Sequence, residues 1–291
     1  MVGKCPEWMH YCYSGKAWST ATLSIGGSAM FVVVVTVLVM FILFLKNLHK
    51  LLHMRQHYKI FATTFVCAAL RIPWWVMNMV TYKDNSPPAI AIQMLNRICM
   101  LALYLSQSFY VQTWLRVIIA LRQYKGERAL KIFFMLMDSV VSILLVIELI
   151  YRAFDTQGRN DNGKYSPLYN VGIDVIAGGC LLTCFVYVIV GTILFYKLKH
   201  YYTCCSTTII GFISVSILLS SASLLRFVSL TYHILSGEHM NDNQYAIQCY
   251  LIPDIIPSFT ITIVQVTIYR SERKKRVRLN ADSEDITPYL Q

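Results

Sequence analysis

Seven ionisable residues interrupt the long apolar stretches of this chain, and side chains of these types can support chemistry. They are Arg71, Arg97, Asp138, Glu148, Asp174, Arg226 and Asp254. A charge in the middle of a bilayer costs about 3 kcal/mol on insertion scales, so such groups usually face the interior of a helix bundle and pair. We expect all of them except Asp138 to form one intramembrane charge network. Such a network either holds helices together or forms a site for a ligand, an ion or a proton.

Asp254 has the most informative surroundings, because it lies between two prolines in the stretch CYLIPDIIPS. Pro253 and Pro257 each remove a backbone hydrogen bond, which predicts a helix kink whose freed carbonyl groups line an interior space. An acid between them should face inwards. We expect Asp254 to be ionised and paired with Arg226, with Arg71 close by.

Membrane helices have to position these charges. The chain is 56% hydrophobic and only 14% charged, whereas soluble domains average about 25% charged residues. A helix that spans a bilayer needs about 20 predominantly apolar residues. Seven segments meet that description: 24–45, 60–82, 90–121, 132–154, 169–196, 208–235 and 245–269. The sequence therefore predicts an all-α membrane protein, a bundle of seven transmembrane helices.

The distribution of Lys and Arg predicts the orientation of this bundle. Seventeen of them lie in the tail and in the loops after the first, third and fifth segments. Six lie on the opposite side: Lys4, Lys16, Lys83, Arg152, Arg159 and Lys164. Because cytosolic loops are enriched in Lys and Arg, we expect a luminal or extracellular segment over 1–23, the transmembrane domain over 24–270 and a cytosolic tail over 271–291. The net charge of +11 is then mostly a topology signal, and it requires no nucleic-acid partner.

The tail begins with the basic run RSERKKRVR and becomes acidic afterwards. A basic run directly after a membrane helix attracts anionic lipid, and it can also recruit a cytosolic partner. The candidate residues for this surface are Arg273, Lys274, Lys275, Arg276 and Arg278.

The nine cysteines are scattered, with neither a CxxC pattern nor a Cys/His spacing typical of a metal site. Cys204 and Cys205, in YYTCCSTT, are candidates for palmitoylation next to a membrane helix. The alternative is that they are simply two small neighbouring residues. Cys5 and Cys12 lie on the outer side, where they can form a disulfide or remain free thiols.

Several known seven-helix chemistries do not fit these residues. The last segment has no lysine that could bind retinal, and the chain has TWLRVI and IIPSFTITIV where the common receptor class has Asp-Arg-Tyr and Asn-Pro-x-x-Tyr. His49, His53 and His57 share one helical face, but the basic residues between them disfavour a divalent metal. We therefore expect no enzyme activity, no cofactor and no metal.

Four stretches resemble the tobamovirus multiplication protein family. KIFATTFVCAALRIPWWVMNMVTYKD is similar to its second helix, ALYLSQSFYVQTWLRVI with Trp114 to its third, SSASLLRFVSLTY with Arg226 to its sixth, and YLIPDIIPSFTITIVQVTIYR to its seventh. The fourth and fifth segments match only in hydropathy. The chain departs from the plant members by having Asp254 where Glu is expected, and by lacking a run of prolines after the last segment.

The resemblance implies a scaffold rather than a catalyst. The family includes plant proteins of the vacuolar membrane, which recruit viral replication proteins and an Arf-like small GTPase. It also includes lysosomal animal proteins that regulate Rag GTPase and TOR signalling. The resemblance therefore predicts that this protein recruits small GTPases or signalling proteins to an endomembrane. The plasma membrane is the other possible location. The alternatives are a G-protein-coupled receptor for an unknown ligand and a proton-coupled transporter or channel.

Overall fold

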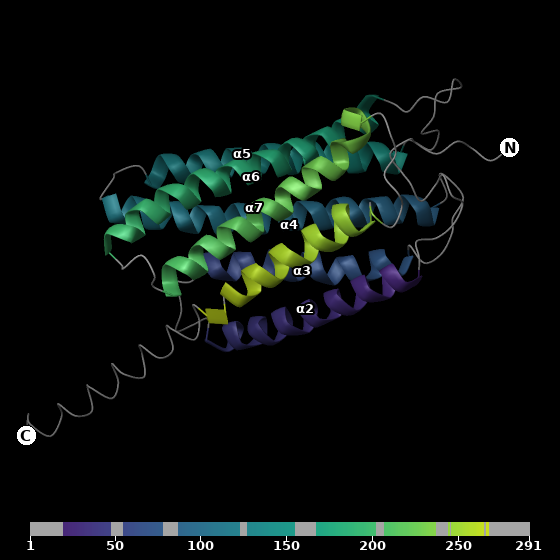
Figure 1. Ribbon diagram of the computed structural model, residues 1–291. Helices are drawn as coiled ribbons and strands as arrows, with labels where there is room; N and C mark the ends of the chain where they lie inside the picture. The colour runs from purple at the N-terminus through teal and green to yellow at the C-terminus, as the bar shows by residue number, and fades with distance from the viewer. Residues whose placement is uncertain are drawn as a thin grey trace, which may run out of the picture.

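A computed structural model of the chain (Figure 1) describes residues 20–47, 55–77, 87–122, 127–154, 167–201, 207–236, 244, 246–264 and 266–267. Six long α-helices lie side by side: α2 (Thr20–Asn47), α3 (Arg55–Met77), α4 (Pro87–Arg122), α5 (Glu127–Phe154), α6 (Pro167–Tyr201) and α7 (Thr207–Ser236). The last helix covers 246–264 and opens with the π-helical turns η3 (Ala246–Leu251). No residue in these ranges forms a strand.

Each predicted apolar segment overlaps one of these helices, although the predicted segments 60–82 and 245–269 run past the last described residues of their helices. The observed helices extend beyond the apolar cores, as where α3 begins at Arg55 and α6 ends at Tyr201. Basic and aromatic side chains suit such ends, because long stems and rings lie along apolar surface while their polar tips reach water. Most of the predicted N-terminal segment and the whole tail lie outside the described residues.

Six of the described helices are long and apolar enough to cross a membrane, namely α2, α3, α5, α6, α7 and the last helix. Helix α4 is longer, with 36 residues, but its composition does not reach the same apolar character. It contacts α3, α5 and α6, and it lies in the middle of the bundle in Figure 1. Its polar residues Ser106, Gln107 and Ser108 are buried. Because neighbouring helices cover α4, its side chains do not need to be apolar.

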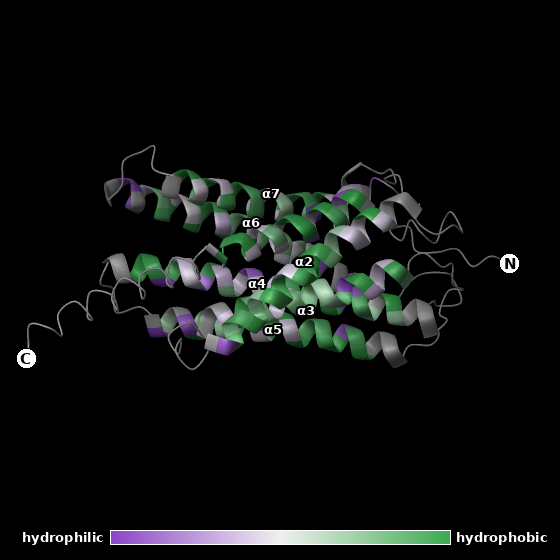
Figure 2. Cartoon of the chain, turned by 90° about the horizontal axis from the view of Figure 1, so that it is seen from below, coloured by the Kyte–Doolittle hydropathy of each residue, from purple (hydrophilic) through white to green (hydrophobic). Residues whose placement is uncertain are grey.

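The outer surface of the bundle is apolar. Large apolar side chains are exposed on all seven described helices, for example Phe31 on α2, Leu136 on α5, Phe185 on α6 and Ile217 on α7. Figure 2 shows hydrophobic residues along these helices. Soluble monomers rarely expose apolar patches of more than a few hundred Å². The surface and the helix composition together indicate an integral membrane protein in a lipid bilayer.

Aromatic side chains fill the interior. Trp114 on α4 has its ring centroid 4.6 Å from that of Phe212 on α7 and 5.7 Å from that of Tyr187 on α6. A second cluster contains Trp74 and Trp75 of α3. These rings join helices that are far apart in the sequence, and aromatic pairs of this kind add stability beyond their buried area.

Helix α2 packs closely at Gly26. A Cβ atom there would lie 2.9 Å from Cε2 of Trp75 and 2.9 Å from Cδ1 of Leu251, whereas a Cβ at Gly27 would have no neighbour within 4 Å. The absence of a side chain at Gly26 therefore allows α2 to pack closely against both α3 and the last helix.

We predict that Gly26→Ala and Gly27→Ala have opposite effects on stability. Overpacking at Gly26 should cost about 1–3 kcal/mol. At Gly27 the methyl group meets open space, and alanine has a helix propensity better than that of glycine by about 0.8–1 kcal/mol. Thermal unfolding of the purified variants in detergent measures the difference. Equal midpoints would contradict the close approach of α2.

Candidate functional site

Asp254 is completely buried and lies between two arginines from other helices. Nε of Arg71, on α3, lies 2.6 Å from Asp254 Oδ2, in an ion pair that lacks the alignment of a hydrogen bond. Nη2 of Arg226, on α7, donates a hydrogen bond to Asp254 Oδ1. The structure thus brings together the acid and the two partners that we expected for it. We call Arg71, Arg226 and Asp254 the charge centre.

Pro253 helps to position Arg226. Proline has no N–H group, so Pro253 cannot donate to the carbonyl oxygen four residues earlier, which belongs to Cys249. Arg226 Nε donates to this oxygen at 3.1 Å. The π-helical turns end at Leu251, two residues before the proline, and such turns are frequent at functional sites. Arg226 therefore binds both the backbone and the carboxylate of the last helix.

Arg71 has further partners on two other elements. Its Nη1 donates to Oδ1 of Asn96, on α4, at 2.7 Å. Its guanidinium carbon lies 4.5 Å from the ring centroid of Trp74 and 5.6 Å from that of Tyr250. Cation–π contacts of this kind stabilise a desolvated arginine by about 2 kcal/mol. Arg71 therefore links α3, α4 and the last helix.

Asn96, Trp74 and Tyr250 were not predicted as site residues, although the sequence contains a signal for two of them. Asn96 is a polar residue in an apolar segment, and Trp74 follows Arg71 by three positions, which places both on one helical face. The position of Tyr250 depends on how the last helix packs against α3.

Five polar atoms of this region have no hydrogen-bond partner among the described residues, and two of them, Arg71 Nε and Asp254 Oδ2, form an ion pair with each other. Nη2 of Arg71 and Oγ of Ser258 are both buried without a hydrogen-bond partner in these residues. Arg226 uses Nε and Nη2, and its Nη1 makes no hydrogen bond in the described part of the chain. Two guanidinium groups share one carboxylate, so the charge centre carries a net charge of about +1.

The prediction of one intramembrane charge network was wrong. The structure contains the charge centre and, apart from it, a second ion pair between Arg97 and Glu148. Nε of Arg97, on α4, donates to Oε1 of Glu148, on α5, at 3.0 Å, and both side chains are buried. Asp174 is exposed and makes no ion pair with a described residue. Asn96 and Arg97 are neighbours on α4, and successive residues of an α-helix point about 100° apart. Asn96 therefore contacts α3, while Arg97 contacts α5.

Asp138 lies apart from both groups, on α5. It accepts a hydrogen bond from Ser108 Oγ at 2.7 Å and one from Gln112 Nε2 at 3.2 Å. Both donors are neutral side chains of α4. Asp138 is half-buried, and hydrogen bonds from neutral groups take the place of a cation.

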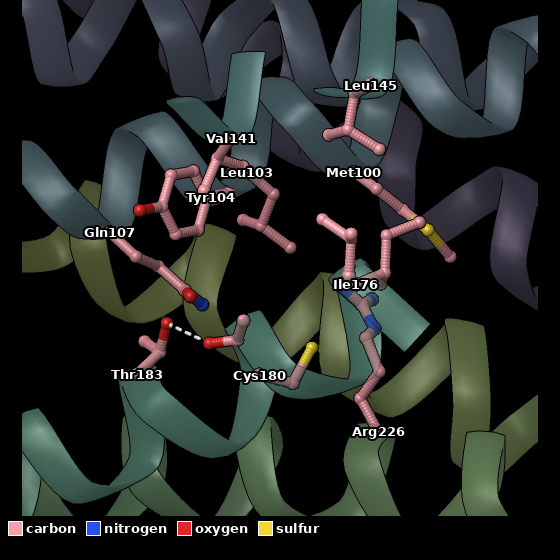
Figure 3. A pocket seen from close by; sticks show the side chains of 12 residues that line it. Met100, Leu103, Tyr104, Gln107, Val141, Leu145, Ile176, Cys180, Thr183 and Arg226 are labelled. Carbon is pink, nitrogen blue, oxygen red and sulfur yellow. Dashed lines mark hydrogen bonds between the residues drawn. The ribbon is translucent and has the colours of Figure 1, made fainter. Parts of the chain in front are cut away.

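A small cavity lies beside Arg226, between α4, α5, α6 and α7 (Figure 3). Its volume is about 30 Å³, which is room for roughly two water molecules. The polar residues of its wall are Tyr104, Gln107, Thr183 and Arg226. The Thr183 hydroxyl donates to the Gly179 carbonyl at 2.7 Å. The arginine of the charge centre therefore borders an interior space.

The other candidate residues lie outside the described part of the chain. They are the basic residues Arg273, Lys274, Lys275, Arg276 and Arg278, and the cysteines Cys204 and Cys205. Within the described ranges, no group of three or more His, Cys, Asp or Glu side chains could hold a metal. The chain matches no family model, no curated protein and no solved structure.

We predict that removing the acid of the charge centre is worse than removing either base. Asp254→Asn leaves two uncompensated arginines and should cost about 3–5 kcal/mol. Arg226→Gln leaves Arg71 and Asp254 as a neutral pair, so its cost should be smaller. The double variant Asp254→Asn/Arg226→Gln should recover part of the loss. Thermal unfolding in detergent gives the order of stability.

Asp174→Asn is the matched control for this series. The same chemical change at an exposed site should stay within about 0.5 kcal/mol of the native protein. If Asp254→Asn behaves like this control, the buried carboxylate does not hold the helices together.

Proposed function

We propose that the protein is a non-enzymatic seven-pass membrane scaffold that recruits cytosolic small GTPases or other signalling proteins to an endomembrane of the vacuolar or lysosomal type. One observation carries the proposal. Three of the stretches that resemble the tobamovirus multiplication protein family each contribute one residue of the charge centre: Arg71 from AALR, Arg226 from LLRF and Asp254 from IPDI. The contact between these three residues in the structure supports a relation to the family that goes beyond shared hydrophobicity.

The geometry of the charge centre also favours a scaffold. Its carboxylate is fully buried and both of its oxygens face arginines. Such an arrangement fixes α3, α7 and the last helix relative to one another, because removing one member of a buried pair is strongly unfavourable. A rigid frame of this kind supports a scaffold role.

The proposal includes α4 as the seventh crossing. At 1.5 Å per residue, its 36 residues extend over about 54 Å, well beyond the roughly 30 Å of a hydrocarbon core. Its buried cation Arg97 is paired with Glu148, which offsets the cost of a charge in the membrane. With α4 as a crossing, the excess of Lys and Arg after the odd-numbered segments supports an N-terminus outside or in the lumen and a cytosolic tail.

A receptor is the second candidate, and the cavity beside Arg226 is the observation in its favour. Ligand pockets for drug-sized molecules measure about 300–1,000 Å³, whereas this cavity measures about 30 Å³. We therefore propose the scaffold function first and the receptor function second.

The proposed topology predicts which cysteines an impermeant thiol reagent can label. In sealed cells, Cys204 and Cys205 should react only after the membrane is permeabilised, and after hydroxylamine treatment if they carry acyl groups. Cys5 and Cys12 should be reached only from the other face. A C-terminal epitope that antibodies reach without permeabilisation would contradict a cytosolic tail.

Recruitment through the basic run can be tested by neutralising its five candidate residues together with Gln or Ser. Proximity labelling from the tail should then recover at least several-fold less small GTPase, because charged partners and anionic lipid are both attracted by this run. The location of the protein is measured against lysosomal, vacuolar and plasma-membrane markers in the same cells.

A charge-preserving variant is the matched control. Exchanging Arg for Lys and Lys for Arg within the run keeps the field but changes the side chains, so it should recruit normally. Because Lys and Arg also direct membrane insertion, thiol labelling must show an unchanged topology in both variants. Undiminished recruitment by the neutral variant would place the partner surface on the loops between helices.

A further inference from the structure

The charge centre has one positive charge more than its own acid can balance. The other intramembrane acids are engaged elsewhere or lie at the surface. Glu148 binds Arg97, Asp138 accepts from neutral donors, and Asp174 is exposed. A buried charge without a counter-ion is strongly unfavourable in a medium of low dielectric constant. The excess charge therefore calls for an anion close to Arg71 or Arg226.

Arg226 offers a free donor at the cavity. Its side chain is only 6% exposed, its Nε and Nη2 bind the last helix, and Nη1 has no hydrogen-bond partner among the described residues. The residue lines the cavity, and Figure 3 shows its guanidinium group directed towards Ile176 and Met100 at the cavity wall.

A second free donor faces the same space from α4. Gln107 is 7% exposed and lines the cavity, and its side-chain amide has no hydrogen-bond partner in the described part of the chain. Figure 3 shows this amide directed towards Thr183 and the interior of the cavity. A neutral amide and a guanidinium group that lack acceptors together make a wall that favours a negatively charged occupant.

The volume limits what that occupant can be. About 30 Å³ corresponds to roughly two water-sized spheres. A lipid headgroup exceeds this space, whereas a single halide ion fits it. Apolar side chains such as Met100, Leu145 and Ile176 form much of the rest of the wall.

We propose that the cavity between α4, α5, α6 and α7 binds a small inorganic anion of the chloride class on Arg226 Nη1 and the Gln107 amide. The anion balances the excess charge of the charge centre and so stabilises the packing of α7 against the last helix. This inference rests on the contacts around Arg226 and is independent of the proposed scaffold function.

Chloride is the probe for the test. The purified full chain in detergent is unfolded by heat in mixtures of potassium chloride and potassium gluconate at constant ionic strength. Gluconate is too large for the cavity. A ligand that binds only the folded state stabilises it in proportion to the logarithm of its concentration, so Tm should rise by about 2–5 °C per tenfold increase in chloride. An equal Tm in both salts overturns the proposal.

Two variants locate the effect. Gln107→Leu removes the amide at nearly constant volume and should raise the chloride concentration at half-effect by about tenfold or more, as expected for the loss of a hydrogen bond to a charged group. Gln112→Leu is the matched control on the same helix, because Gln112 donates to Asp138 and does not line the cavity. Equal chloride responses of the two variants would overturn the assignment to this cavity.

A tethered carboxylate provides an independent measurement. Leu145→Glu places an acid at the cavity wall, where it can take the position of the anion. The Leu145→Glu variant should be as stable in gluconate as in chloride. This measurement does not depend on whether an Arg226→Gln variant folds. A full chloride response in Leu145→Glu would show that the anion binds elsewhere and would overturn the proposal.

Discussion

A guanidinium group buried among apolar helices has lost its water, and it must find acceptors in the protein. In this molecule two such groups share the carboxylate of Asp254, and the arrangement of the inner helices follows from that requirement. Arg71 recruits the Asn96 amide and two aromatic faces as additional acceptors. Arg226 takes the carbonyl oxygen of Cys249. The Asn96 contact joins α4 to α3, and the Cys249 contact joins α7 to the last helix.

The need of buried polar groups for partners within the protein also explains how polar and apolar residues are distributed among the helices. Helix α4, which carries the buried polar residues Ser106, Gln107 and Ser108, lies where other helices cover it, and it supplies partners to α3 and α5. The most apolar surfaces, as on α2 and α5, face outwards. In lipid no hydrophobic force holds helices together, and association depends on close packing and on interhelical hydrogen bonds. The aromatic clusters and the close approach at Gly26 supply the packing, while the arginines and Asp138 take part in hydrogen bonds between helices.

The helices and the central ion pair could be predicted from the sequence, because both follow from local composition and charge. Segments of more than twenty apolar residues have few alternatives to a helix in lipid, and a buried acid next to prolines needs a cation. The division between the charge centre and the Arg97–Glu148 pair could not be predicted in this way. It depends on the rotation of α4 about its axis, which decides that Asn96 reaches α3 while Arg97 reaches α5. The cavity likewise results from the packing of four helices and has no sequence motif.

The spacing of these partners has a consequence for the order of assembly during synthesis. Arg97 precedes Glu148 by 51 residues, which a ribosome needs about 3–10 s to add, so α4 must wait that long for its counter-charge. Arg71 waits for almost the entire remaining chain, because Asp254 belongs to the last helix. Until that helix arrives, both arginines of the charge centre remain without their carboxylate. The final helix therefore acts as a closing step, and a nascent chain that stops short of it presents unbalanced cations to the quality-control machinery of the membrane.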